Sequence, residues 1–528
     1  MSSAPVSPHP AEFTAVRKQL FVNSGLLGIS RLLSMGTSLV TVPVVLSRLG
    51  LGGYGGWEAM MAIAALVTVF QTTVNGTLVW KMSAAYGNGD AAGIRRLMGE
   101  GIAVVLGMFA LITPLVWATR YQLVGLSNIP PLYRDAAVWV IPILVSQTTL
   151  GAAGETFAAV LIAHQRAGIT TLIQTTALMA NSGFVIVGLL HGWQVWSLLL
   201  GNTVGVVAAI AGQYLAVVKI CGMASIQPHL PSWDEARPLL KYAGFLALGQ
   251  ISIALRDQTD KLVLARVGNT VWTAWFGLAS RLSNLVLAIC SFFYVPLVAA
   301  VAALAARGDW VGVRRIYADT MIVMPFLTGA FVVLVASSYD RLLTVWIGHA
   351  VPQVGPILFI LLTGNITAVV LAGVGSSLCK GIGRVSLETT YIVICVVANV
   401  VLKLVLTPWL GPIGTVLSSA ASWALGSIIF VIMLHRAVEL PNAALRAAAM
   451  LPMMAITVVI TREAVTFMPA STTRGHAALA GTEIGLFSIV LFVVLLAATR
   501  ILPWATLRRV GAELRAFLLA RLGGRYAF

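Results

Sequence analysis

LSRLGLGGYGGWE, at residues 46–58, returns 218 positions later as LARVGNTVWTAWF, at residues 264–276. A second pair of segments, GNGDAAGIRRLM at 87–98 and ARGDWVGVRRIY at 306–317, is offset by 219 positions. Because the two blocks keep nearly the same spacing in both halves, we interpret the chain as an internal repeat and not as a set of similar loops. The repeat indicates two structurally equivalent halves.

The segments around these blocks are long and apolar. Of the 528 residues, 59% are hydrophobic and only 10% are charged, against roughly 25% charged in soluble domains. The apolar residues form about fourteen runs, each long enough to cross about 30 Å of hydrocarbon as a helix. Since lipid offers the backbone no hydrogen-bond partners, these runs must be helical. The expected helices are 20–48, 57–83, 98–119, 136–163, 168–190, 195–219, 242–266, 271–305, 317–338, 353–379, 386–407, 411–435, 443–466 and 481–502.

The spacing of the repeat predicts how these helices are grouped. Six helices separate equivalent points, so both copies enter the membrane from the same side. We therefore expect an all-α polytopic membrane protein with two six-helix bundles in parallel pseudo-repeat, followed by two additional C-terminal helices. The expected divisions are a polar cytoplasmic tail (1–19), the N-terminal bundle (20–219), a cytoplasmic linker (220–241), the C-terminal bundle (242–435), the two additional helices (436–502) and a basic amphipathic cytoplasmic tail (503–528).

The formal net charge is +16, and the basic residues are distributed unequally between the two sides of the membrane. Lys and Arg cluster in alternate loops: an N-terminus inside assigns about 22 of them to cytoplasmic segments and about 7, Arg341 among them, to the other side. This bias predicts a multi-pass protein of the bacterial inner membrane with both termini cytoplasmic. It also explains the basic composition without nucleic acid as a partner.

No catalytic motif accompanies the helices. The connections are short, as in LGLGGYGG at 49–56 and NIPP at 128–131, and the chain contains no HExxH, GxSxG or Walker A sequence. GNGD at 87–90 follows a membrane helix and not a strand, so we interpret it as a turn and not as a phosphate loop. The four cysteines have no metal-ligand spacing. The sequence therefore predicts a transporter and not an enzyme, with no cofactor and no metal site.

Charged residues inside the apolar runs are the candidates for the transport pathway. Each costs roughly 2.5–3.5 kcal/mol at mid-bilayer, so such residues usually face a polar interior. Four cations are candidate contacts of an anionic cargo: Arg31, Arg281, Arg256 and Lys403. Lys403 lies near the end of its helix and could equally extend its ammonium to the membrane surface. Arg31 and Arg281 have no carboxylate one turn away, so each needs a partner from outside its own helix. Arg31 could pair with a carboxylate of another helix, and Arg281 could extend its guanidinium to the membrane surface.

The acidic candidates serve either ion coupling or structural charge pairing. In RDQTDK at 256–261, Arg256 with Asp260 and Asp257 with Lys261 are both i,i+4 pairs. These pairs can neutralise each other, or one carboxylate can take a proton or Na⁺ while its cation meets the cargo. Glu155 lies alone within the fourth expected helix.

The segment 256–317 resembles the polysaccharide exporters of the multidrug/oligosaccharidyl-lipid/polysaccharide (MOP) flippase superfamily. The similar parts are DKLVLARVG at 260–268, ASRLSN at 279–284, Pro296, and ARGD followed by RRIY. The first helix and turn and the segment LGPIGTVLSSAAS at 410–422 are similar as well, and the count of fourteen helices resembles MurJ-type lipid II flippases. The resemblance implies two bundles around a central cavity that work by alternating access. It also implies that Arg31 and Arg281 bind a diphosphate.

The repeat, the intramembrane cations and the missing ATP motif favour transport of an anionic cargo. The resemblance implies a Wzx-type flippase that moves an undecaprenyl-diphosphate-linked oligosaccharide, an exopolysaccharide or O-antigen unit, from the inner to the outer leaflet. The expected partners are this lipid-linked substrate, membrane lipids, and the polymerase and export machinery of the same pathway. The first alternative is a cation-coupled multidrug exporter of the same superfamily. The second is a membrane glycosyltransferase or polymer ligase.

Overall fold

The computed structural model describes the backbone of residues 10–126, 128–222, 258–468 and 473–501, together with residues 504, 508 and 512. The side chain of Arg31 lies outside the described residues, as do Arg256, Asp257 and most of the tail 503–528. Throughout these described ranges the regular elements are helices, and eleven of them are long and apolar enough to cross a membrane. The prediction of an all-α polytopic membrane protein is confirmed.

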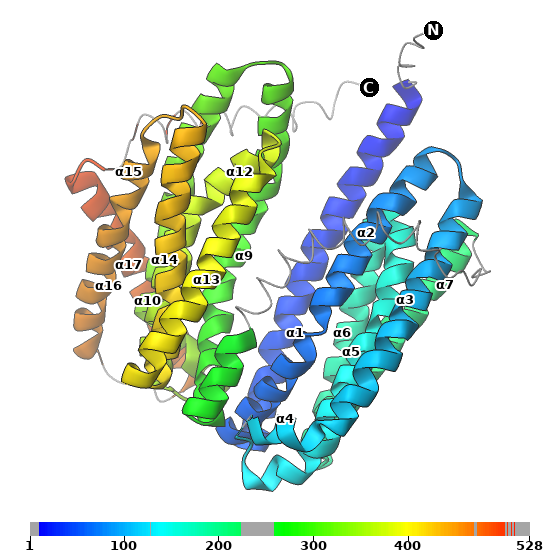
Figure 1. Ribbon diagram of the computed structural model, residues 1–528. Helices are drawn as coiled ribbons and strands as arrows, with labels where there is room; N and C mark the ends of the chain where they lie inside the picture. Colours follow the sequence, from blue (N-terminus) through cyan, green and yellow to red (C-terminus); the bar gives the residue numbers. More distant parts are fainter. Residues whose placement is uncertain are drawn as a thin grey trace. The chain divides into compact units, whose positions relative to one another are not determined.

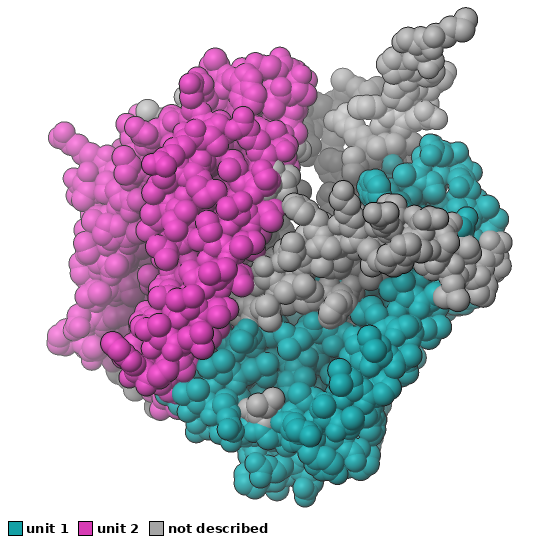
Figure 2. Space-filling model, viewed as in Figure 1, with its two compact units in different colours: residues 1–274 teal, residues 275–528 magenta. Residues whose placement is uncertain are grey.

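The chain divides into two compact units, residues 1–274 and 275–528, drawn in two colours in Figure 2. The division falls later than the linker predicted at 220–241, within the helix that begins at Thr270. Residues 258–267, which the repeat assigns to the second half, are helical and are counted with the first unit. The domain boundaries expected from the sequence remain a prediction.

Unit 1 contains the helices of the first half of the chain, shown in blue to green in Figure 1. Each of the first six expected helices corresponds to a helix or a pair of helices in the structure. They are α1 (Pro10–Ala65), α2 (Thr68–Gly87), α3 (Ala91–Ala118), α4 (Arg120–Leu126), α5 (Pro131–Ala163), α6 (Ala167–Leu190) and α7 (Val195–Cys221).

The connection expected at 49–56 is far shorter in the structure than in the prediction. Helix α1 continues through this stretch with one non-helical residue, Gly50, at φ 68° and ψ 176°. Only glycine adopts such a backbone readily, so a single residue makes the sharp bend between the first two membrane passes. The second pass is itself interrupted by a turn at 66–67 before α2 begins. The prediction of an eight-residue loop was wrong because helical hydrogen bonding resumes directly after Gly50.

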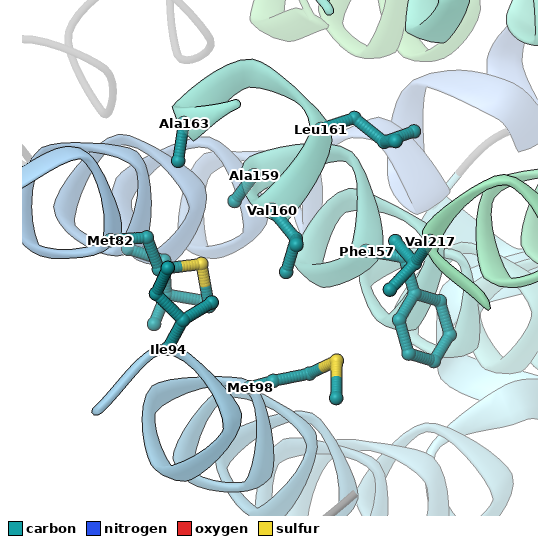
Figure 3. Packing of buried hydrophobic residues seen from close by; sticks show 10 residues of the cluster. Met82, Ile94, Met98, Phe157, Ala159, Val160, Leu161, Ala163 and Val217 are labelled. Carbon is teal, nitrogen blue, oxygen red and sulfur yellow. The ribbon is translucent and has the colours of Figure 1, made fainter. Parts of the chain in front are cut away.

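Helix α5 is the centre of unit 1 and packs against α1, α2, α3 and α7. Its buried face is rich in small residues, Ala152, Gly154, Ala158 and Ala159 among them, and small side chains allow membrane helices to approach closely. At its C-terminal end a buried apolar cluster closes the bundle, with Met82, Ile94, Met98, Phe157 and Val217 among the residues drawn in Figure 3. This packing fixes the side chains that α5 carries further along its length.

Unit 2 contains the remaining helices, coloured green to red in Figure 1. A short π-helical segment, η1, separates α11 from α12 inside one predicted membrane pass. The elements are α9 (Thr270–Ala306), α10 (Trp310–Ile347), α11 (Val354–Thr367), η1 (Ala368–Gly373), α12 (Val374–Gly381), α13 (Val385–Leu410), α14 (Pro412–Ala437), α15 (Ala443–Ala448), α16 (Met450–Thr466) and α17 (Arg474–Ala498).

Helix α10 joins the repeat to the additional C-terminal helices, since it packs against both α16 and α17. A side chain at Gly329 of α10 would clash with Met454 of α16 and with Phe492 of α17. On the other side of the unit, α13 and α14 form a closely packed pair, and α14 also contacts α11. The two additional helices are therefore an integral part of unit 2.

The second block of the repeat folds in the same way in both units. Asp90 accepts a hydrogen bond from the Gly93 amide at 2.7 Å at the start of α3, and Asp309 accepts one from Gly312 at 2.8 Å at the start of α10. The preceding glycines, Gly89 and Gly308, both have φ 72°, a conformation that favours glycine. The interpretation of GNGD as a turn and not as a phosphate loop is confirmed, and its aspartate is a helix N-cap.

Candidate functional site

Lys261 forms a partly buried ion pair in unit 1. Its Nζ lies 2.8 Å from Oε2 of Glu58, and the Tyr54 hydroxyl donates to Oε1 of the same carboxylate at 2.9 Å. Glu58 and Tyr54 lie on α1 beyond the Gly50 bend, so this cluster ties the second membrane pass to the helical residues 258–267. Asp260, the neighbour of Lys261, is buried. A carboxylate and an ammonium at this distance offset each other's charge, which reduces the cost of burying either.

Glu155 of α5 is held by two amides from neighbouring helices. The Asn75 Nδ2 of α2 donates to its Oε2 at 2.8 Å, and the Gln174 Nε2 of α6 donates to its Oε1 at 3.0 Å. Both partners are neutral, so each can hold the carboxylate without neutralising it. An intramembrane carboxylate in such a setting can exchange a proton or bind a monovalent cation.

Arg281 lies on α9 at the start of unit 2, where its side chain is half-buried. Two residues further along, the buried Ser283 accepts a hydrogen bond from Asn365 Nδ2 of α11 at 2.8 Å. This bond ties α9 to the helix that continues into η1. π-Helical turns are rare and occur frequently at functional sites, which makes α9, α11 and η1 a candidate region of unit 2.

Lys403 of α13 is only 7% exposed. Its Nζ donates to Oδ1 of Asn399, one turn earlier, at 2.9 Å. The Asn399 Nδ2 in turn donates to the Ser419 hydroxyl of α14 at 2.9 Å, within a buried polar seam between the two helices. Of the two expectations for Lys403, the geometry therefore favours a side chain directed into the protein over one extended to the membrane surface.

The predicted residues lie in both units and have different described partners. In unit 1, Lys261 pairs with Glu58, whereas Glu155 is held by Asn75 and Gln174. In unit 2, Arg281 lies on α9, and Lys403 donates a hydrogen bond to Asn399 on the same helix, α13. The side chain of Arg31, as well as Arg256 and Asp257, lies outside the described residues. Their roles, and the two i,i+4 pairs of the segment 256–261, stay predictions.

Sequence reasoning missed Glu58, Asn75 and Gln174. Glu58 closes the repeated block 46–58, but its partner Lys261 is 203 positions away, and no local spacing reveals such a pair. Asn75 and Gln174 are neutral, so a search for intramembrane charges passed over them. The sequence did contain one indication of them: Glu155 has no basic residue within its own predicted helix, 136–163, so its carboxylate required polar partners from other helices.

No protein-family model matches the chain, and no curated protein matches it. Among solved structures, 28 chains are similar. An inward-facing multidrug resistance MATE family transporter of the MOP superfamily shares 14% identity at a TM-score of 0.66, over 76% of this chain and 94% of its own. The lipid II flippase MurJ, in an inward closed conformation, shares 13% identity at a TM-score of 0.66, over 91% of this chain and 100% of its own. A mutant of the Vibrio cholerae MATE transporter VcmN shares 17% identity at a TM-score of 0.54, over 82% of this chain and 99% of its own.

At sequence identities of only 13–17%, these similarities show the fold of the chain and nothing further. The chain has the fold of the MATE transporters and of the lipid II flippase MurJ, and the predicted resemblance to the MOP superfamily is confirmed at that level.

Proposed function

We propose that this protein is a flippase that moves an undecaprenyl-diphosphate-linked oligosaccharide from the inner to the outer leaflet of the bacterial inner membrane. The similar structures are transporters and a flippase and not enzymes, which supports transport as the general activity. The observation that carries the proposal is Arg281, a half-buried guanidinium group on α9 of unit 2. Arg281 lies on α9 and the buried Lys403 on α13, and cations inside a membrane protein suit an anionic cargo.

The additional C-terminal helices support a lipid-linked cargo. The lipid II flippase covers 91% of this chain and the MATE transporter 76%. Residues 436–502 make up about an eighth of the chain, so the 9% that the flippase leaves uncovered is too short to contain all of them. Part of these helices therefore belongs to the similarity with a protein that is named for a lipid substrate.

In this proposal Arg31, Arg281, Arg256 and Lys403 contact the diphosphate, and guanidinium groups suit phosphate because they donate two parallel hydrogen bonds. Outward movement of an anion is favoured by an inside-negative membrane potential, by about 2.3 kcal/mol per charge per 100 mV. The cargo can thus be moved without ATP. Polymerase and export proteins of the same pathway would take it up at the outer leaflet.

The experiment is a leaflet assay in vesicles that contain the purified protein. A fluorescent undecaprenyl-diphosphate-linked oligosaccharide is placed in the membrane, and an impermeant reagent reports the fraction exposed outside over time. We expect wild-type protein to accelerate exposure and Arg281→Gln to reduce the rate at least about tenfold, because a charged hydrogen bond contributes roughly 1.5–3 kcal/mol. Arg314→Gln is the matched control, since Arg314 is an exposed arginine paired with Glu439. Equal rates with and without protein would refute the proposal.

Glu155 favours a second function, a cation-coupled multidrug exporter. A carboxylate held by the neutral Asn75 and Gln174 is suited to exchange a proton or Na⁺ against a cationic drug. Dye efflux from the same vesicles under a proton or Na⁺ gradient separates the two functions. Efflux that depends on Glu155, without exposure of the lipid-linked sugar, would establish the exporter and exclude the flippase.

The orientation is testable in cells. The positive-inside rule places Arg314 in the cytoplasm and His349, at the other end of α10, outside. We expect an impermeant maleimide to label His349→Cys in intact cells and to label Arg314→Cys only after permeabilisation. The reverse pattern would contradict cytoplasmic termini.

A further inference from the structure

Three aromatic side chains surround the guanidinium group of Arg120, the residue with which α4 begins (Figure 1). Its Cζ lies over the rings of Trp139 of α5, Tyr121 of α4 and Trp117 of α3, at 4.8, 5.0 and 5.7 Å from their centres. The two tryptophan rings also meet edge to face, with their centres 5.9 Å apart. None of these four residues belongs to the charges proposed above to contact the transported molecule.

The length of α3 places this cluster at a membrane surface. Ala118, the last residue of α3, follows Arg96 by 22 residues, which at 1.5 Å per residue corresponds to about 33 Å along the helix axis. That distance exceeds the roughly 30 Å thickness of the hydrocarbon layer, so Arg120 lies at the surface opposite to Arg96. The positive-inside rule places Arg96 in the cytoplasm and Arg120 at the outer surface. Arg120 therefore lies at the depth of the outer lipid headgroups.

The positive charge of Arg120 has no carboxylate partner among the residues that the structure describes. Its one described hydrogen bond runs from Nη2 to the Tyr121 hydroxyl, at 3.4 Å. Asp135 lies one turn before Trp139 on α5, and no ion pair joins it to Arg120. Each ring attracts the cation electrostatically but supplies no negative charge. Since a guanidinium group carries five N–H donors, donors remain for the oxygens of an anion.

Exposed apolar side chains lead from this cluster into the membrane. Leu106 and Ala110 of α3 lie three and two helical turns before Trp117, so the three residues share one face of the helix. On α5, Leu150 follows Trp139 by three turns and shares its face in the same way. Leu106, Ala110 and Leu150 are all exposed. A cation at the membrane surface with such an apolar stripe below it suits a molecule that carries an anionic head on an apolar tail.

We propose that this cluster, the Arg120 site, binds the phosphate of an anionic glycerophospholipid in the outer leaflet. Arg120 donates to the phosphate oxygens, while Trp139 and Tyr121, which are 47% and 64% exposed, border the headgroup. The acyl chains lie along the stripe that contains Leu106 and Leu150. The site is independent of the transported substrate and of the proposed function.

Two observations favour this occupant over aromatic anchoring alone. Trp and Tyr gather at membrane surfaces in general, but that tendency does not explain one guanidinium group held among three rings without a described carboxylate. Because the rings fix the Arg120 side chain in advance, less conformational freedom is lost when a ligand binds. A zwitterionic lipid would bring an ammonium group to a place where Arg120 offers only like charge, so an anionic lipid is favoured.

The test is native mass spectrometry of the purified full-length protein in a neutral detergent, titrated with dihexanoyl phosphatidylglycerol. The half-saturating concentration of the first bound lipid measures the affinity. Arg120→Gln removes the charge, and Tyr121→Glu places a carboxylate beside it at an exposed position, where no buried group is altered. Arg134→Gln is the matched control, because Arg134 is an exposed arginine in the first turn of α5 with no described aromatic contact.

We expect Arg120→Gln and Tyr121→Glu to raise the half-saturating concentration at least about tenfold, since a charged hydrogen bond is lost or a carboxylate competes with the phosphate. Arg134→Gln should change it by less than about twofold, because salt screens an exposed charge outside the site. The proposal is overturned if Arg134→Gln weakens binding as much as Arg120→Gln does, or if Tyr121→Glu binds like the wild type. It is also overturned if dihexanoyl phosphatidylcholine binds as tightly, if equimolar inorganic phosphate displaces the lipid, or if undecaprenyl phosphate is preferred.

Discussion

The ion pair between Glu58 and Lys261 should be strongly coupled, and a double-mutant cycle can measure this. The two charged atoms are 2.8 Å apart, and the side chains are only 9% and 21% exposed. Unit charges about 4 Å apart attract by about 4 kcal/mol at an effective dielectric constant near 20, and desolvation offsets part of this attraction. Breaking a buried pair from one side costs about 3–5 kcal/mol. Because a fifth of the Lys261 side chain reaches the surface, we expect Lys261→Met to cost about 3 kcal/mol, at the lower end of that range.

The double variant Glu58→Gln/Lys261→Met should recover most of this loss. The glutamine still accepts the hydrogen bond that the Tyr54 hydroxyl donates at 2.9 Å, and both charges of the Glu58–Lys261 pair are removed together. The assay is the melting temperature of the purified protein, in which about 1 kcal/mol corresponds to roughly 2 °C for a unit of this size. Lys261→Met should therefore lower it by about 6 °C, and the double variant by less than half as much.

A second ion pair supplies the control. Arg314 and Glu439 also lie 2.8 Å apart, but their side chains are 46% and 91% exposed. Exposed pairs of this kind contribute little, because water screens them and two long side chains lose freedom. The same cycle at Arg314 and Glu439 should give no measurable coupling. If the losses at Glu58 and Lys261 simply add, burial does not strengthen this pair and the reasoning is refuted.

Three further predictions follow from single side chains. Glu155→Gln keeps the amide partners but removes the charge, so exposure of the lipid-linked cargo should stay within about twofold of the wild type; a larger loss would show coupling through this carboxylate. Lys403→Met takes away the donor of the buried Asn399 oxygen and should destabilise the protein by about 1–3 kcal/mol; an unchanged melting temperature would contradict its place in the seam. Gly329→Leu should cost about 1–3 kcal/mol or more, because it forces α16 and α17 away from α10, whereas Gly107→Leu, at an open position, should be tolerated.

The sequence predicted the helices well because their signal is local. Within the described residues, apolar length alone located the eleven helices that are long and apolar enough to cross a membrane. The two caps at Asp90 and Asp309 follow from the same Gly-Asp pattern in both repeats. The bend at Gly50 was placed correctly but its extent was not. Hydropathy does not distinguish an eight-residue loop from one residue in an unusual conformation.

The contacts of the candidate site were less predictable, since they join helices that are far apart in the sequence. The sequence offered Asp257, one turn away, as a possible partner of Lys261, and that pair lies outside the described residues. The ion pair of Lys261 within the described residues is with Glu58, 203 positions earlier. Arg341 was expected in a connection after a helix that ends at 338, but α10 continues to Ile347 and buries it. This burial depends on α16 and α17 packing on α10. Spacing along one helix reveals neighbours on that helix and says nothing of the helix opposite.

These contacts also change the argument for an anionic cargo. The count of intramembrane cations suggested a positive interior, but Lys261 is offset by Glu58 at 2.8 Å and presents little net charge to a ligand. The Lys403 ammonium already donates to Asn399 beside the seam between α13 and α14, so fewer of its donors remain for a diphosphate. An ammonium has three donors and a guanidinium five in a planar fork, so an arginine can hold a protein partner and still meet a diphosphate. The diphosphate hypothesis therefore depends on the arginines Arg281 and Arg31, and not on the number of cations.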